Sequence, residues 1–199
     1  DGQLIFKSNA ISTGQLDTFT GTISGTGNVT VERFIPAGDN NKRAFRLVTS
    51  TVSTSNSIKM NWQEGENNTS ATNLNPNPGY GTHISGSITG ANGFDATGSG
   101  NPSLFIFDHV GQTWGGINNT DMSTLDAGAP YLLMVRGDRS IDLTSNTSTP
   151  TNTTLRATGT LRTGSVNATP SMAVGAGGFS FIGNPYQAVV DYGSLTTTN

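Results

Sequence analysis

Leu104-Phe105-Ile106-Phe107 and Tyr131-Leu132-Leu133-Met134-Val135 are continuous apolar runs, and they decide the fold class of this chain. A strand that alternates apolar and polar residues lies half in water, whereas an unbroken apolar run is typical of a strand covered on both faces. The two runs are therefore predicted to be central strands of a β-sheet and to form the core.

Further segments carry short apolar or alternating runs and are separated by clusters of Gly, Asn, Pro and Ser. They are residues 3–7, 28–35, 43–51, 153–162 and 178–183. This pattern predicts an all-β fold, an antiparallel β-sandwich or a jelly-roll-like arrangement. In the second segment Val29 and Val31 alternate with Thr30 and Glu32, and no face is cleanly apolar, so this strand is predicted to contact protein on both sides.

Composition argues against helix. Gly, Ser, Thr and Asn supply 96 of the 199 residues. In a helix Gly costs about 1 kcal/mol relative to Ala, while Thr, Ser and Asn lose rotamer freedom or compete for backbone hydrogen bonds. Residues 53–102 and 144–153 are dense in such residues and are predicted to be long polar surface loops. We expect almost no helix, with one turn at Asn61-Trp62-Gln63-Glu64.

Charge and cysteine content narrow the function classes. The net charge is only -3, and no basic stripe is present that would follow a phosphate backbone, so nucleic acid is not an expected partner. No apolar run approaches the roughly 20 residues that cross a bilayer, and membrane insertion is not expected. The chain has no cysteine, little Lys and abundant Thr and Asn, a combination that indicates an extracellular, secreted location.

Six landmarks follow one another along the chain: Val29-Thr30-Val31-Glu32-Arg33-Phe34-Ile35-Pro36-Ala37, Arg43-Ala44-Phe45-Arg46-Leu47, Asn61-Trp62-Gln63-Glu64-Gly65, Pro78-Gly79-Tyr80-Gly81-Thr82-His83-Ile84-Ser85-Gly86, Tyr131-Leu132-Leu133-Met134-Val135-Arg136-Gly137-Asp138-Arg139 and Gly183-Asn184-Pro185-Tyr186. Over residues 28–192, this series resembles a β-rich domain of very large secreted or surface proteins of the Bacteroidota, which are often cargo of the type IX secretion route. The resemblance implies adhesin-like or matrix proteins on the outer cell surface. It brings no catalytic residues to this chain.

The two ends of the chain differ from its middle in their pattern of apolar and polar residues. Residues 1–27 are predicted to be an N-terminal strand segment that could close a preceding repeat. Residues 28–199 are predicted to be the β-sandwich domain, incomplete at its C-terminus because the last apolar run leads into Thr-Thr-Thr-Asn. This suggests a module of a longer polypeptide.

No residue pattern predicts an enzyme, and no cofactor is expected. His83 and His109 are the only histidines, too few for a histidine-based zinc site without carboxylate ligands. Asp108 and His109 are adjacent and would point to opposite faces of a strand, and no nucleophile elbow accompanies them. Arg136-Gly137-Asp138 is the integrin-binding tripeptide, but a tight hairpin turn between 134–135 and 141–143 is the favoured interpretation.

Two kinds of binding site remain open. Trp62, Tyr80 and Trp114, with Glu64, would make a glycan platform of aromatic faces beside polar groups. The alternative, which we favour, is that both tryptophans pack long loops onto the sheet. A structural calcium ion is a second option, and its weak candidate ligands are Asp95, Asp108, Asp121 and Asp126.

The sequence thus predicts a non-catalytic extracellular β module of a bacterial surface or secreted protein, acting in adhesion or as structural or filament material. The alternative is a carbohydrate-binding module attached to a secreted enzyme. The expected partners are a surface glycan or neighbouring copies of the same protein, the latter through self-assembly at open sheet edges.

Overall fold

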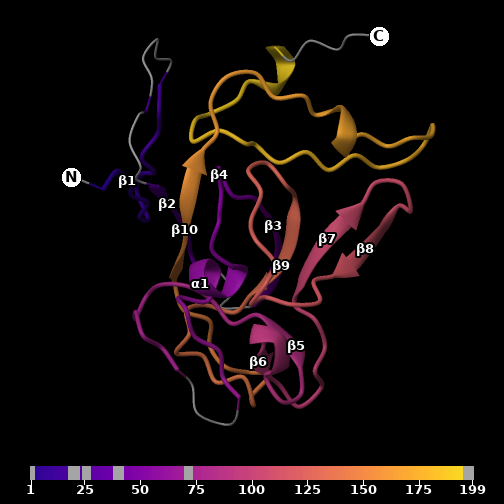
Figure 1. The fold of residues 1–199 in the computed structure, drawn as a ribbon. Coiled ribbons are helices and arrows are strands. Elements are labelled where there is room, and N and C mark those ends of the chain that lie inside the picture. Colours follow the sequence, from indigo (N-terminus) through magenta and orange to yellow (C-terminus); the bar gives the residue numbers. More distant parts are fainter. Residues whose placement is uncertain (1–2, 18–22, 24–27, 38–42, 70–73, 195–199) are drawn as a thin grey trace.

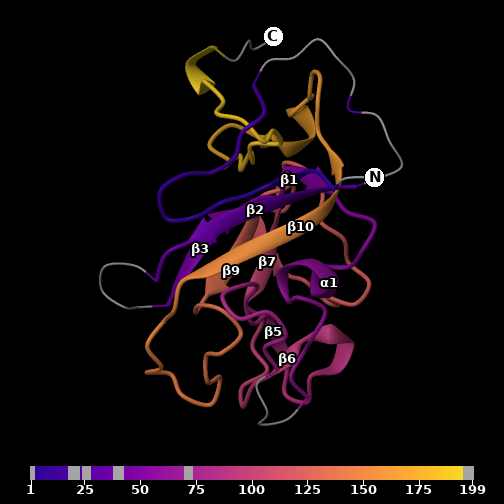
Figure 2. The same ribbon diagram turned by 90° about the vertical axis from the view of Figure 1, so that its left-hand side faces the viewer.

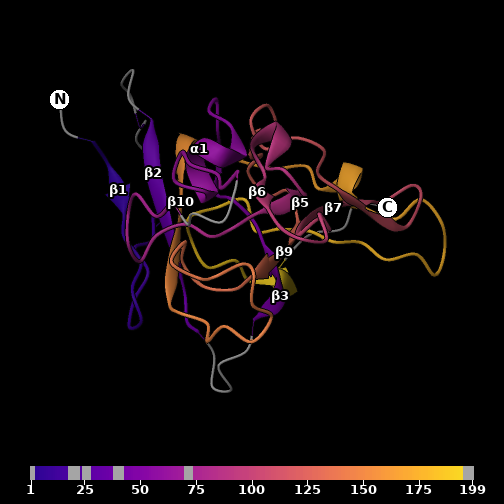
Figure 3. The same ribbon diagram turned by 90° about the horizontal axis from the view of Figure 1, so that it is seen from below.

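A computed structural model describes residues 3–17, 23, 28–37, 43–69 and 74–194 of the chain. Two four-stranded sheets face each other (Figures 1 and 3), which confirms the predicted all-β sandwich. The first sheet has the order β1 (Ile5–Phe6), β2 (Val29–Ile35), β10 (Thr153–Leu161), β4 (Val52–Ser53), and the second has the order β3 (Ala44–Val48), β9 (Tyr131–Val135), β7 (Leu104–Asp108), β8 (Thr113–Gly116). A short parallel pair, β5 (Ser85–Ser87) and β6 (Asp95–Ala96), lies below them in Figure 1.

The order of the strands is that of a jelly roll. From β2 to β4, consecutive strands alternate between the sheets, and β10 returns to lie between β2 and β4. The β2–β10 pair is antiparallel over seven residues, from Val29 opposite Gly159 to Ile35 opposite Thr153. Beyond β4, an irregular segment continues the first sheet, because the Thr54 amide donates to the Leu125 carbonyl at 2.9 Å.

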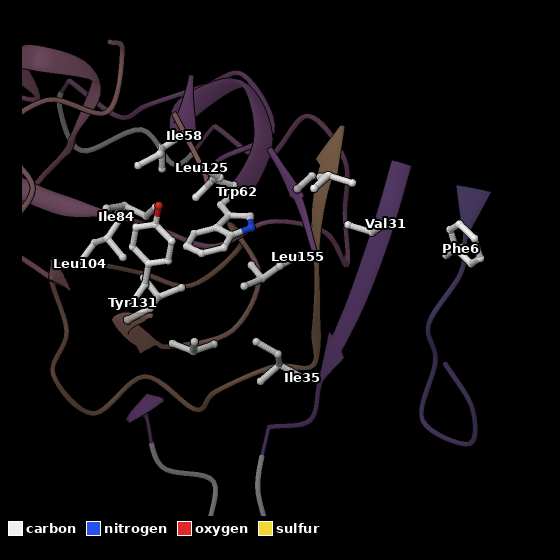
Figure 4. Close-up of a cluster of buried hydrophobic side chains, with 14 of the residues drawn as sticks. Phe6, Val31, Ile35, Ile58, Trp62, Ile84, Leu104, Leu125, Tyr131 and Leu155 are labelled. Carbon is white, nitrogen blue, oxygen red and sulfur yellow. The ribbon is translucent and has the colours of Figure 1, made fainter. Parts of the chain in front are cut away.

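The core lies between the two sheets (Figure 4). Val31 and Leu155 enter it from the first sheet and Tyr131 from the second. Leu133, also on β9, belongs to the same buried cluster. As predicted, β7 and β9 are the interior strands of their sheet. The prediction that both faces of these strands are covered is wrong, because burial alternates along β9 and the residues on the outer face are only half-buried. The expectation that β2 contacts protein on both faces is confirmed, since Val29 to Glu32 are all buried.

Residues 53–102 are not the surface loop that their composition predicts. They contain the helix α1 (Ile58–Trp62), β5, β6 and a 3-10 turn, η1 (Ala91–Gly93). Ile58 and Trp62 bury the inner side of α1 in the core, and Ser57 caps the helix by accepting from the Met60 amide. The single helical turn that we predicted therefore exists, but it begins three residues earlier. Two further 3-10 turns, η2 (Thr169–Ser171) and η3 (Tyr192–Ser194), follow β10.

Both ends of the described chain join the sandwich. β1 pairs in parallel with β2, and Phe6 belongs to the buried cluster, so the first strand shares the core of the domain predicted to start at residue 28. Of the predicted segment 1–27, residues 1–2, 18–22 and 24–27 lie outside the described residues. The prediction of a strand at 178–183 is wrong, since this segment is not a strand in the structure. Its Phe181 instead packs on Phe107, with ring centroids 4.7 Å apart. Across the described residues, no helix has the length and apolar character to cross a membrane.

The packing of the core predicts that the same substitution, Leu to Ala, lowers stability by different amounts at two positions. Leu133 on β9 is fully buried between the sheets, whereas Leu47 on β3 is 59% exposed. Leu133→Ala leaves a cavity and should lower the free energy of unfolding by about 2 to 5 kcal/mol. Leu47→Ala should cost well under half as much. Urea unfolding followed by fluorescence measures both, and equal losses would contradict this packing.

Candidate functional site

The most concentrated polar chemistry in the molecule is a buried ion pair. Arg139, which follows β9, and Asp95 on β6 are both fully buried, and the guanidinium binds the carboxylate with both terminal nitrogens, at 3.0 and 2.8 Å. The amides of Asn68 and Ile84 donate to the same carboxylate at 2.8 and 2.9 Å. Five hydrogen-bond donors, with Gln63 as the fifth, therefore converge on one carboxyl group. A charge so fully engaged is a structural tie between segments, not a free acid or base.

His83 completes this cluster. Its side chain is fully buried, with Nε2 3.1 Å from the Ile141 carbonyl and Nδ1 3.3 Å from the Asp95 carboxylate. Burial raises the pKa of Asp95, but hydrogen bonds and charge from His83 and Arg139 outweigh that effect and leave the pKa below its ordinary value. Of the two His83 ring nitrogens, only Nε2 is hydrogen-bonded to a described residue, since Nδ1 approaches the carboxylate without hydrogen-bond geometry. In His109, Nε2 lies 3.2 Å from the Phe181 carbonyl.

The Arg136-Gly137-Asp138 tripeptide lies at the end of β9 and is not displayed to solvent. Asp138 is buried and accepts hydrogen bonds from the Gly79 amide at 2.8 Å and the Thr151 hydroxyl at 2.9 Å. Gly137 has a φ of 137°, which side chains rarely adopt, so the turn interpretation is supported. The predicted hairpin is not supported, because residues 141–143 form no strand.

Two of the four predicted platform residues meet at Arg156, in the middle of β10. Glu64 binds the Arg156 guanidinium through both carboxylate oxygens, and the Arg156 guanidinium carbon lies 4.2 Å from the centre of the Tyr80 ring. Gly81 makes this possible, since a Cβ there would come within 2.7 Å of the Glu64 side chain. Beside them, α1 and the outer face of β2 and β10 form a polar groove of about 230 Å³ that also contains Glu32.

The two tryptophans lie elsewhere. Trp62 is 3% exposed and packs edge-on against Tyr131 in the core, with ring centroids 5.4 Å apart. Trp114 on β8 packs against Phe107 and Phe181, at 5.1 and 5.0 Å. The four residues therefore do not form one platform, and the favoured alternative, that the tryptophans hold neighbouring segments onto the sheets, describes their contacts.

Arg156 was not identified from the sequence as a site residue. The usable signal was a lone charge in a predicted strand, with threonines two positions away on either side.

The calcium candidates are scattered. Asp95 is held by Arg139, and Asp121 pairs with Lys59 at 2.8 Å. Asp108 accepts from the Val110 amide in the β7–β8 turn, and the Asp126 amide donates to the Tyr131 hydroxyl. Within the described residues, no three His, Asp or Glu side chains come together as metal ligands would. Asp108 and His109 likewise form no catalytic pair, since each binds backbone of a different segment.

Comparison of the chain with protein family models, with curated proteins and with solved structures gives no match. Any statement about function therefore depends on the geometry of this molecule and on its sequence.

The ion pair makes a testable prediction about stability and pH. Asp95→Asn leaves the Arg139 charge buried without its partner, which should cost about 3 to 5 kcal/mol at pH 7. Asp121→Asn, which removes a surface ion pair, should cost less than about 1 kcal/mol. Since folding lowers the pKa of Asp95, its contribution is fully present above the unfolded value of about 3.8 and is lost as the pH falls from there through the folded-state pKa.

Denaturant unfolding of both variants and the unaltered chain, from pH 7 down to pH 3, measures this. The difference between the unaltered chain and Asp95→Asn should shrink only in the acidic part of that range. Equal costs for the two variants at pH 7 would contradict the structural role of Asp95.

Proposed function

We propose that the chain is a non-catalytic extracellular β module of a bacterial surface or secreted protein, which acts in adhesion or as structural material and associates with copies of itself. Composition and the resemblance to Bacteroidota surface proteins support the location. The observation that carries the function is an open apolar surface on the second sheet, at the edge strand β3.

That surface is built by three adjacent strands. Phe45 and Leu47 of β3 are 47% and 59% exposed, and the outward side chains of Leu132 and Met134 on β9 continue the patch. Phe105 of β7 completes the patch, and its ring centroid lies 5.9 Å from that of Phe45. Contiguous exposed apolar side chains of this kind mark interaction surfaces, and β3 has a free edge because, among the described strands, it pairs with β9 alone.

A second copy fits this edge. Two β3 strands that pair antiparallel across a two-fold axis repeat the same apolar side chains on both sides, as an isologous interface requires. A register with Leu47 opposite its counterpart sets Arg46 opposite Val48, so the two Arg46 charges do not face each other. Backbone hydrogen bonds would then join the second sheets of both copies.

Phe45→Lys tests this association, because it puts a charge in the middle of the apolar patch. The unaltered chain should form dimers or larger assemblies as concentration rises, and Phe45→Lys should weaken self-association at least tenfold. Val110→Lys is the control, since Val110 is an exposed apolar residue, 79% accessible, in the β7–β8 turn, away from β3. Sedimentation velocity over a concentration series measures all three. A monomer at every concentration, or equal behaviour of the two variants, contradicts the proposal.

The Arg156 groove supports a second candidate function, carbohydrate binding. Arg156 lines it together with Asn61 and the carboxylates of Glu32 and Glu64, and the Tyr80 ring packs against the Arg156 guanidinium, a mixture of groups suited to sugar hydroxyls. If the groove binds a glycan, Tyr80→Ala should weaken retention on a polysaccharide affinity gel by about tenfold or more, whereas Trp114→Ala should not. Equal retention of both variants, or none by the unaltered chain on a glycan array, counts against it.

A further inference from the structure

A cleft of about 390 Å³ opens between the two sheets, at the end where the C-terminal segment crosses the sandwich. Figure 2 shows this segment, in yellow, above the ends of β2 and β10. Val31, Leu155 and Ala157 of the first sheet line the cleft, and so do Trp62 and Val48. The first four are core residues with very little exposure, so the cleft reaches the hydrophobic interior.

Gln187 anchors the C-terminal segment that lines one side of the cleft, here called its roof. Its backbone carbonyl accepts from the Leu16 amide at 2.7 Å, and its side chain donates to the Gly14 carbonyl at 2.6 Å and accepts from the Thr51 hydroxyl at 2.7 Å. These bonds join segments from the two ends of the described chain to the residue that precedes β4. Tyr186, whose hydroxyl donates to the Gly164 carbonyl, lines the same roof. Hydrogen bonds therefore fix the segment that bounds the cleft on this side.

A positive charge without a partner lies in the lining. Arg33 alternates on β2 with Val31 and Ile35 and lines the cleft, but it is exposed to solvent, which places its charge at the mouth. It forms no hydrogen bond or ion pair with any described residue. Glu32, the one carboxylate among the described lining residues, accepts from the Ser8 amide. Nearby on β3, Arg46 donates to the Pro36 carbonyl but leaves its buried Nε without a partner.

We propose that this cleft binds an amphipathic anion, a molecule with an apolar chain or ring that enters between the sheets and a carboxylate that meets Arg33. The volume is within the range of small-molecule sites, and their lining is typically apolar with a few polar groups that fix orientation. Each methylene group buried in the cleft should raise affinity about fourfold. The lining shares Leu47 and Val48 with the β3 edge, whereas Arg33 and Trp62, on which the proposal depends, lie outside the proposed self-association surface.

Trp62 makes binding and orientation measurable. The chain has two tryptophans, and Trp114→Phe, which keeps an aromatic ring against Phe107 and Phe181, leaves Trp62 as the single reporter at the cleft. Dodecanoate brominated at its terminal carbon should quench Trp62 fluorescence in a saturable way, below the critical micelle concentration. Dodecanoate brominated beside its carboxylate should quench much less, because the bromine then lies at the mouth with Arg33.

Arg33→Gln tests the charge, and it should fold normally because Arg33 has no partner to lose. In the Trp114→Phe background it should weaken binding of the terminally brominated dodecanoate about tenfold and leave the matching brominated alcohol unaffected. Arg43→Gln, at an exposed arginine that binds Asn146, is the control and should change neither. Absence of saturable quenching, equal quenching by the two bromine positions, or equal effects of the two arginine variants overturns the proposal.

Discussion

The buried pair of Asp95 and Arg139 is the constraint on which the arrangement of this sandwich depends. It joins β6, inside the long insertion between β4 and β7, to the segment that follows β9. A buried ion pair adds little net stability compared with apolar packing, but loss of one partner is costly, so its main effect is to permit only the register in which both charges meet. Asn68 and Ile84 are fixed by the same carboxylate, and the insertion folds as part of the core.

The two sheets consequently have different outer surfaces. Over the first sheet, Tyr80 and Glu64 both contact Arg156 on the outer side of β10, and Glu64 forms an ion pair with it. Among the residues that the structure describes, the segment of Phe181 covers one end of the outer side of the second sheet, over β7 and β8, and the surface at β3 stays apolar and open. Asp95, Arg139, Glu64 and Arg156 are thus all used in ties between segments of the fold.

The sequence was sufficient for the parts of the fold that follow from local pattern. The apolar runs of β7 and β9 identified the interior strands, but they could not say that one face would lack a cover, since that depends on which segment packs there. Residues 178–183 have the pattern of a strand, yet Phe181 satisfies its apolar character by packing on Phe107 and Trp114. Asp95 and Arg139 were not identified as partners because they are far apart in the chain and carry no periodic signal.

Native-state hydrogen exchange of the Asn68 and Ile84 amides tests the central claim most directly, namely that the polar chemistry of the insertion is structural. If both amides are held by the buried Asp95 carboxylate, they should exchange only through global unfolding, as slowly as the amides of the central strand β9. Exchange of either amide at the rate of an open surface loop, with β9 still protected, would contradict the account.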